Sequence, residues 1–170
     1  MIPSFQIELE HIKIEILHKR GQHLRQFVDQ WFCYKNGYTT NGGRAKWSEI
    51  SFNEYRSLGI VKLLELYSIQ ELCSMKGTER LFVEKEHVIP LRVIKQKLID
   101  LPTNVSLEEI ENVLTSNVHF ATITKQEDSL LNEMGLRQKM PREYYDSNSS
   151  LFMDPFARYK VCGIELIKPS

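Results

Sequence analysis

An acid and an imidazole stand next to each other in the chain at Glu86 and His87. A carboxylate beside an imidazole can carry out general acid–base catalysis or bind a metal ion. Side chains alternate between the two faces of a strand, so Glu84 and Glu86 are expected on one face and His87 on the other. The pattern predicts a divalent metal, Mg²⁺ or Mn²⁺, at Glu84 and Glu86. His87 would join it where the strand ends, and Glu86 and His87 are the predicted catalytic pair.

The run Glu86-His-Val-Ile-Pro90 resembles the histidine-containing core of the ββα-metal nucleases over about five residues. The resemblance implies phosphodiester cleavage, with a second strand and a helix carrying Asn or His after the histidine. Here the residues after Pro90 predict a helix through Leu101 instead. Asn104 is the nearest candidate partner, and it follows Pro102, which is expected to end that helix.

A second group of chemically capable residues lies in the basic, tyrosine-containing stretch 135–160. Arginine forks bind phosphates, and tyrosine rings stack on bases. Arg142 is predicted to stabilise the charge that develops during phosphodiester cleavage. The predicted substrate-binding residues are Arg137, Lys139, Tyr144, Arg158 and Tyr159. The alternative is a solvated connection held in place by its aromatic side chains.

The N-terminal part of the chain predicts helix followed by a loop. Apolar residues recur at helical spacing from residue 5 to 33, with a predicted break at Arg20 and Gly21. Residues 34–49 contain Asn-Gly and Asn-Gly-Gly turn signals, and basic residues alternate with aromatic ones. Both stretches suit a protein partner or a second copy of the chain, and the loop also suits nucleic acid.

The elements that must position these residues follow from capping boxes and apolar runs. Helix starts are predicted at the capping boxes Ser51–Glu54, Ser106–Glu109 and Thr124–Glu127, the first opening a helical region to about Met75. Gly135 is the expected helix end. Strands are predicted at 81–83, 118–124 and 161–167. Helices first, then β-α-α-β-α and a closing strand, predict an α+β class: one helix-rich domain over 1–170 whose small sheet is covered by helices. Its parts are the helical region 1–33, the loop 34–49 and the core 50–170.

Composition narrows the classes further. The 170 residues carry 22 basic and 22 acidic side chains, so the formal charge is zero and any nucleic-acid surface must be local. Cys33, Cys73 and Cys162 are far apart and odd in number, which predicts reduced thiols. The early charges at the N-terminus predict neither a signal peptide nor a membrane span. A cytoplasmic protein without membrane contact is expected.

Two functional hypotheses remain. The sequence lacks the phosphate-loop, dinucleotide and nucleophile-elbow motifs. The first hypothesis is a small nucleic-acid-processing protein, such as a nuclease, that uses Glu86 and His87. The second is a non-catalytic interaction module, that is, an inhibitor, adaptor or accessory subunit. Neutral charge, an incomplete motif set and a long striped helix favour this second hypothesis.

Overall fold

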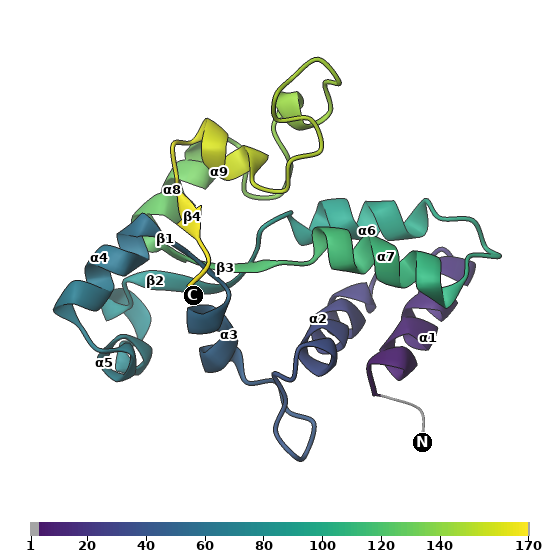
Figure 1. Cartoon of the computed structure of the whole chain (residues 1–170), viewed down its shortest axis with the longest axis horizontal. Coiled ribbons are helices and arrows are strands. Elements are labelled where there is room, and N and C mark those ends of the chain that lie inside the picture. The colour runs from purple at the N-terminus through teal and green to yellow at the C-terminus, as the bar shows by residue number, and fades with distance from the viewer. Residues whose placement is uncertain (1–3, 170) are drawn as a thin grey trace. The chain divides into compact units, whose positions relative to one another are not determined.

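The computed structural model describes residues 4–169, without the side chain of Glu84 (Figure 1). Its residues cluster into two compact units, each assembled from two stretches of chain. Unit 1 comprises Met1–Lys46 and Leu91–Val118, and unit 2 comprises Trp47–Pro90 and His119–Ser170. The predicted N-terminal region can be compared with the structure only from Ser4 onward.

Unit 1 is helical. It consists of α1 (Ser4–Leu17), α2 (Leu24–Lys35), α6 (Leu91–Ile99) and α7 (Leu107–Asn117). Helix α1 packs against α2 and α7. The predicted break in the first helix is confirmed, because residues 18–23 separate α1 from α2. Lys19 lies in this break with a φ of 49°, and its Nζ donates to the Ile99 carbonyl at 2.6 Å, close to where α6 ends.

Most side chains of the predicted apolar stripe are buried. The stripe residues with almost no exposed surface are Leu9, Ile12, Ile16, Leu24, Val28 and Trp31. The first part of the predicted loop is ordered around a short antiparallel bridge between Thr39 and Ala45. Gln30 Nε2 braces that bridge by donating to the Gly43 carbonyl at 2.9 Å. The stripe therefore builds a core within the unit.

Unit 2 contains a mixed four-stranded sheet in the order β2-β3-β1-β4. Its strands are β1 (Tyr55–Ser57), β2 (Phe82–His87), β3 (Phe120–Thr124) and β4 (Leu166–Ile167). β1 runs parallel to β3 and antiparallel to β4, and β2 runs antiparallel to β3. The predicted α+β class, helix-rich with a small sheet, is confirmed.

The helices of unit 2 lie beside this sheet. They are α3 (Trp47–Asn53), α4 (Leu58–Leu66), α5 (Ile69–Ser74), α8 (Lys125–Glu133) and α9 (Ala157–Val161), with short 3₁₀ turns η1 (Gly77–Glu79) and η2 (Arg142–Tyr144). One apolar cluster joins Ile123 of β3 to Leu131 of α8 and Tyr159 of α9. A second joins Phe82 of β2 to Ile60 of α4 and Leu72 of α5. Helices thus pack on the strands from two sides (Figure 1).

The helix-start predictions were right at two boxes and wrong at one. Ser106–Glu109 and Thr124–Glu127 form complete capping boxes. Gly135 ends α8 in the left-handed region at φ 66°. Ser51 instead lies buried inside α3, and strand β1 interrupts the helical region predicted there. Pairing of β1 with both β3 and β4 outweighs the local helical preference.

The last predicted strand, 161–167, was too long. Val161 is the last residue of α9, and β4 is confined to Leu166–Ile167. Gly163, in the left-handed region at φ 67°, turns the chain between them. This turn brings β4 alongside β1 and leaves a hollow between α9 and the sheet.

Candidate functional site

The predicted catalytic residues lie at the end of β2, where the strand is irregular. A register shift falls between Val83 and Glu86, and Lys85 adopts a φ of 61°. Such a bulge places one extra residue in the strand and reverses the alternation of side chains after it. Regular alternation, on which the shared metal site of Glu84 and Glu86 was predicted, therefore does not hold here. The Glu84 side chain itself lies outside the described part of the structure.

Glu86 meets Arg158, a residue from the second predicted group. The Glu86 carboxylate accepts a hydrogen bond from Arg158 Nη2 and forms an ion pair with it. The two residues are 72 positions apart in the chain. Sequence reasoning placed an acid and an arginine in separate segments, and the structure brings these two into contact.

Arg158 is a buried brace. Its side chain is 0% exposed, and its five N–H groups face six protein acceptors. Nε donates to the Val88 carbonyl at 2.9 Å, and Nη1 donates to the Leu136 and Arg137 carbonyls at 3.2 and 3.3 Å. Nη2 is shared by Glu86, the His87 carbonyl and the Tyr159 hydroxyl. Every donor is thus engaged within the protein.

We call these groups the Arg158 cluster: Arg158, Glu86 and Tyr159 with the carbonyls of His87, Val88, Leu136 and Arg137. The cluster ties the end of β2 to the turn after α8 and to α9. Burying a charge is favourable only when it is paired and hydrogen-bonded, and both conditions are met here. In this conformation, the cluster acts as a structural joint, and the guanidinium has no donor left for a phosphate.

His87 takes part in the Arg158 cluster through its backbone carbonyl. Its side chain is 5% exposed, and its ring lies 4.6 Å from the ring of Phe120, centroid to centroid. The backbone next to it is also fixed, since Val88 N–H donates to the His119 carbonyl at 2.8 Å. The imidazole is therefore a packed side chain beside an aromatic ring.

Both predicted tyrosine ligands are enclosed by the protein, unlike the neighbouring Tyr145. Tyr144 and Tyr159 are buried, whereas Tyr145 is exposed. Burial raises the pKa of Tyr159 far above its ordinary value, although the Arg158 charge opposes this. Partial burial, followed by the charge of Tyr144, raises the pKa of Tyr145. Tyr144 and Tyr159 are therefore anchors of the segment, and Tyr145 is the ring accessible to solvent.

The remaining predicted cations are on the surface. Arg137, Lys139 and Arg142 are all exposed. Arg137 Nε lies 3.7 Å from Asp128 Oδ1, and Arg142 begins the η2 turn. These side chains are accessible for an anion, and the structure places none of them on the Glu86 carboxylate.

Among the described residues, no group of three or more His, Cys, Asp or Glu side chains could hold a metal ion. Within the same residues, no helix is long and apolar enough to cross a bilayer.

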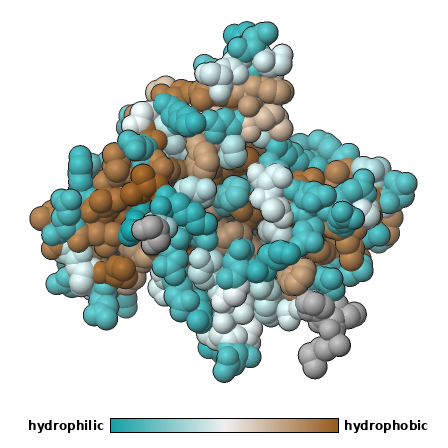
Figure 2. Space-filling model, in the orientation of Figure 1, coloured by the Kyte–Doolittle hydropathy of each residue, from teal (hydrophilic) through white to brown (hydrophobic). Residues whose placement is uncertain are grey.

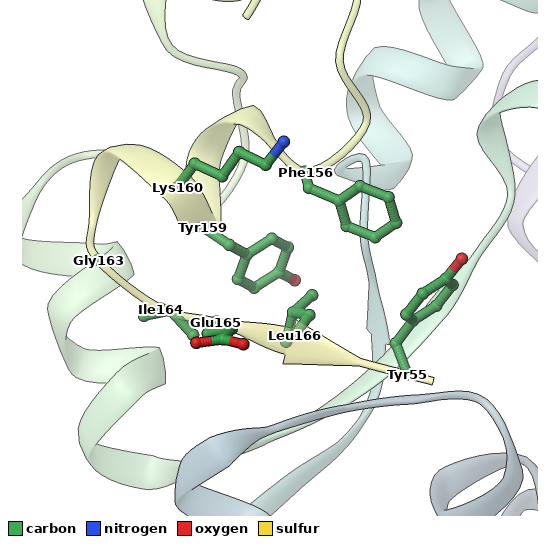
Figure 3. A pocket seen from close by; sticks show the side chains of 8 residues that line it. All are labelled: Tyr55, Phe156, Tyr159, Lys160, Gly163, Ile164, Glu165 and Leu166. Carbon is green, nitrogen blue, oxygen red and sulfur yellow. The ribbon is translucent and has the colours of Figure 1, made fainter. Parts of the chain in front are cut away.

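Two features of unit 2 were missed by sequence reasoning. One is a cavity of about 400 Å³ beside α9 and β4, to which Tyr55, Phe156 and Glu165 contribute (Figure 3). The other is the α4–α5 surface, which we define as Leu58, Leu66, Tyr67 and Ile69, all exposed. The second had a signal in the sequence, because apolar residues surround α4 on nearly all sides, beyond what one buried face requires.

Comparisons with known proteins give no assignment: no protein-family model, no curated protein and no solved structure matches the chain.

Proposed function

We propose that the protein is a non-catalytic interaction module whose contact surface is the α4–α5 surface. The observation that carries this proposal is the exposure of large apolar side chains there. Leu66 is 74% exposed, and Leu58, Tyr67 and Ile69 are more than a third exposed. Figure 2 shows hydrophobic side chains gathered over α4 and α5, at the left of the view. Contiguous apolar patches on a protein surface mark contact sites.

The chemistry of the predicted catalytic residues supports the same choice. A general base must reach a substrate, and an acid must be able to exchange its proton. Glu86 is paired with Arg158, and His87 is packed against Phe120. Both groups are already engaged in contacts within the fold. Catalysis would require them to leave these contacts, whereas binding at the α4–α5 surface would not.

The partner to which the proposal commits is a second copy of the chain. Lys62 and Glu65 are exposed on α4, and neither forms an ion pair within the described residues. In a two-fold contact between identical chains, if one residue of the first copy contacts a second residue of the other copy, the reverse contact also forms. Antiparallel pairing of two α4 helices sets Lys62 of one copy against Glu65 of the other. This opposite-charge match on an apolar surface is the argument for self-association.

Sedimentation across a concentration range tests self-association. The expected result is a monomer–dimer equilibrium that Leu66→Asp weakens by roughly tenfold or more, because a charge is then desolvated in the contact. Leu17→Asp, at an exposed position of α1 in unit 1, is the matched control and should leave the equilibrium unchanged. Lys62→Glu and Glu65→Lys should each weaken the dimer, and the double variant should restore it.

A monomer at every concentration would reject the second copy as partner. The broader proposal has its own test: a photo-crosslinking residue at position 66 in living cells, compared with one at position 17. A defined protein crosslinked at 66 alone would support a different partner on this surface. Equal or absent crosslinking at both positions would reject the α4–α5 surface as a contact site.

Phosphodiester cleavage is a second candidate because the predicted cations Arg137, Lys139 and Arg142 are exposed and accessible to a phosphate. The test is a panel of single- and double-stranded DNA and RNA with Mg²⁺, Mn²⁺ or chelator. Cleavage by the wild type that His87→Ala abolishes would favour this candidate over the interaction module. Intact substrates in every lane would remove it.

A cytoplasmic location is part of the proposal. Cys33, Cys73 and Cys162 are all free thiols, of which Cys73 is exposed. Free thiols persist in a reducing compartment. Fractionation of cells that express the tagged chain checks this point, and recovery from the medium or an oxidising compartment would contradict it.

A further inference from the structure

The cavity beside α9 has aromatic walls. It is lined by Tyr55, Phe156, Tyr159, Lys160, Gly163, Ile164, Glu165 and Leu166, all of unit 2 (Figure 3). Its volume of about 400 Å³ lies within the range of small-ligand sites, which is roughly 300–1,000 Å³. Three of its eight lining residues are aromatic.

These rings are held rigidly. The Tyr55 and Phe156 rings meet edge to face, with centroids 5.0 Å apart and planes at 63°. Tyr159 is fully buried, and its hydroxyl accepts a hydrogen bond from Arg158 Nη2 at 2.9 Å. The Arg158 cluster thus fixes one wall of the cavity. A preformed site loses little conformational entropy when a ligand binds.

The charges around the cavity leave one carboxylate uncompensated. Lys160 Nζ lies 2.6 Å from Asp154 Oδ2, and Lys168 Nζ lies 3.1 Å from Glu54 Oε2, so both nearby lysines are paired. Glu165 is exposed and forms no ion pair with any described residue. Figure 3 shows its carboxylate below the Tyr159 ring, on the wall formed by Ile164 and Leu166.

The Tyr55 ring already attracts a cation. Lys168 Nζ lies 5.5 Å from its centroid, within cation–π range. The negative face of an aromatic ring favours positive charge, and alkylated ammonium groups are well suited because they give up little hydration. Rigid rings with a free carboxylate at the rim are the elements that such a ligand requires.

We propose that this cavity binds an organic cation with an alkylated ammonium group, through Tyr55 and Phe156 with Glu165 at its rim. The group can belong to a free small molecule or to an alkylated lysine of a protein, and both present the same chemistry. The proposal does not depend on the α4–α5 surface.

The test compares a cation with its neutral isostere. Choline and 3,3-dimethylbutan-1-ol have the same shape, and only choline is charged. Calorimetric titration of the full chain should show choline binding roughly tenfold tighter. Peptides with and without trimethyl-lysine form the second arm. Binding of choline points to a free ligand, and binding of the trimethylated peptide alone points to a protein source.

Variants separate the contributions. Glu165→Gln and Tyr55→Leu should each remove most of the discrimination between choline and the alcohol. Tyr145→Leu changes an exposed tyrosine outside the cavity and serves as the matched control. Far-ultraviolet circular dichroism confirms that each variant is folded, and Glu165→Gln, at an exposed position, keeps the test valid if Tyr55→Leu unfolds.

Two results would overturn the proposal. Equal binding of choline and the alcohol would show an apolar cavity without preference for charge. Absence of binding by choline and by the trimethylated peptide at millimolar concentration would show that the cavity is not a cation site.

Discussion

The Arg158 cluster and the α4–α5 surface invert the usual distribution of polar and apolar groups within one unit. A guanidinium, which ordinarily faces water, is completely enclosed, and Leu66 and Ile69, which ordinarily face a core, are in solvent. The residue type alone would assign chemistry to the first region and packing to the second. The surroundings assign packing to Arg158, and the contact role proposed for Leu66 and Ile69 rests on their exposure. The comparison teaches that functional assignment requires the neighbours of a side chain as well as its type.

The largest expected effect is the loss of the Arg158 brace. Arg158→Met leaves the Glu86 carboxylate and several buried carbonyls without a donor, and removal of one partner of a buried pair costs about 3–5 kcal/mol of unfolding free energy. Arg158→Lys should also destabilise, because an ammonium cannot reproduce the fork. Urea denaturation followed by circular dichroism measures both.

The exposed Arg142 provides the control for that measurement. Arg142→Ala should change the unfolding free energy by no more than about 0.5 kcal/mol. If Arg158→Met were as stable as the wild type, the Arg158 cluster would contribute no more to stability than an exposed ion pair does. The proposed contrast with the α4–α5 surface would then fail.

The next effect compares two apolar residues of the same helix. Ile60 is fully buried and Leu66 is exposed. Ile60→Ala should cost about 2–5 kcal/mol by opening a cavity, whereas Leu66→Ala should leave the unfolding free energy of the monomer almost unchanged. Unfolding is measured at protein concentrations below the dissociation constant of the proposed dimer, so that association does not contribute to the unfolding free energy. Similar losses in the two variants would show that Leu66 is part of a core.

Buried polar contacts at a helix start are expected to have an intermediate effect. The Ser57 hydroxyl accepts from Ile60 N–H at 3.2 Å and donates to Glu127 Oε2 at 2.6 Å, linking the starts of α4 and α8. Ser57→Ala should cost about 1–2 kcal/mol, the upper part of the range for a helix cap. Ser68→Ala removes the solvent-exposed cap of α5 and should cost less. Equal losses would mean that burial adds nothing to this cap.

The sequence predicted secondary structure correctly where the signal depends on residues close together in the chain. The boxes at Ser106 and Thr124 and the helix end at Gly135 depend on residues three or four apart, and all three were confirmed. Strand β1 was missed because it has three residues and exists through pairing with β3 and β4. Its partners are distant in the chain, and their register cannot be inferred from local pattern.

The candidate site was harder to predict for the same reason. Glu86 and Arg158 were both selected, yet their contact depends on a bulge at Lys85 and on the packing of α9, which is 72 positions further along the chain. The bulge carries no glycine to announce it, since Lys85 itself takes the positive φ. The aromatic cavity combines Tyr55 of β1 with residues beyond 155, and no spacing rule connects them.

The smallest effect concerns a carboxylate that is hydrogen-bonded, as Glu86 is, but lies fully in solvent. The backbone N–H of Ser106 and then its hydroxyl lower the pKa of Glu109. A carboxyl with a lowered pKa stabilises the fold above its unfolded pKa, and this stabilisation disappears as pH falls through the folded value. Ser106→Ala removes the hydroxyl contribution and should raise the Glu109 pKa toward its ordinary value, which an NMR titration of the Glu109 side chain measures. An unchanged pKa would mean that the backbone N–H acts alone. The expected shift is small because water competes for every acceptor at this helix start, whereas it is excluded from Arg158. Both carboxylates are hydrogen-bonded, and they differ in access to solvent. The exposed cap at Ser106 therefore only shifts the pKa of Glu109, whereas the buried Arg158 cluster holds three segments of the chain together.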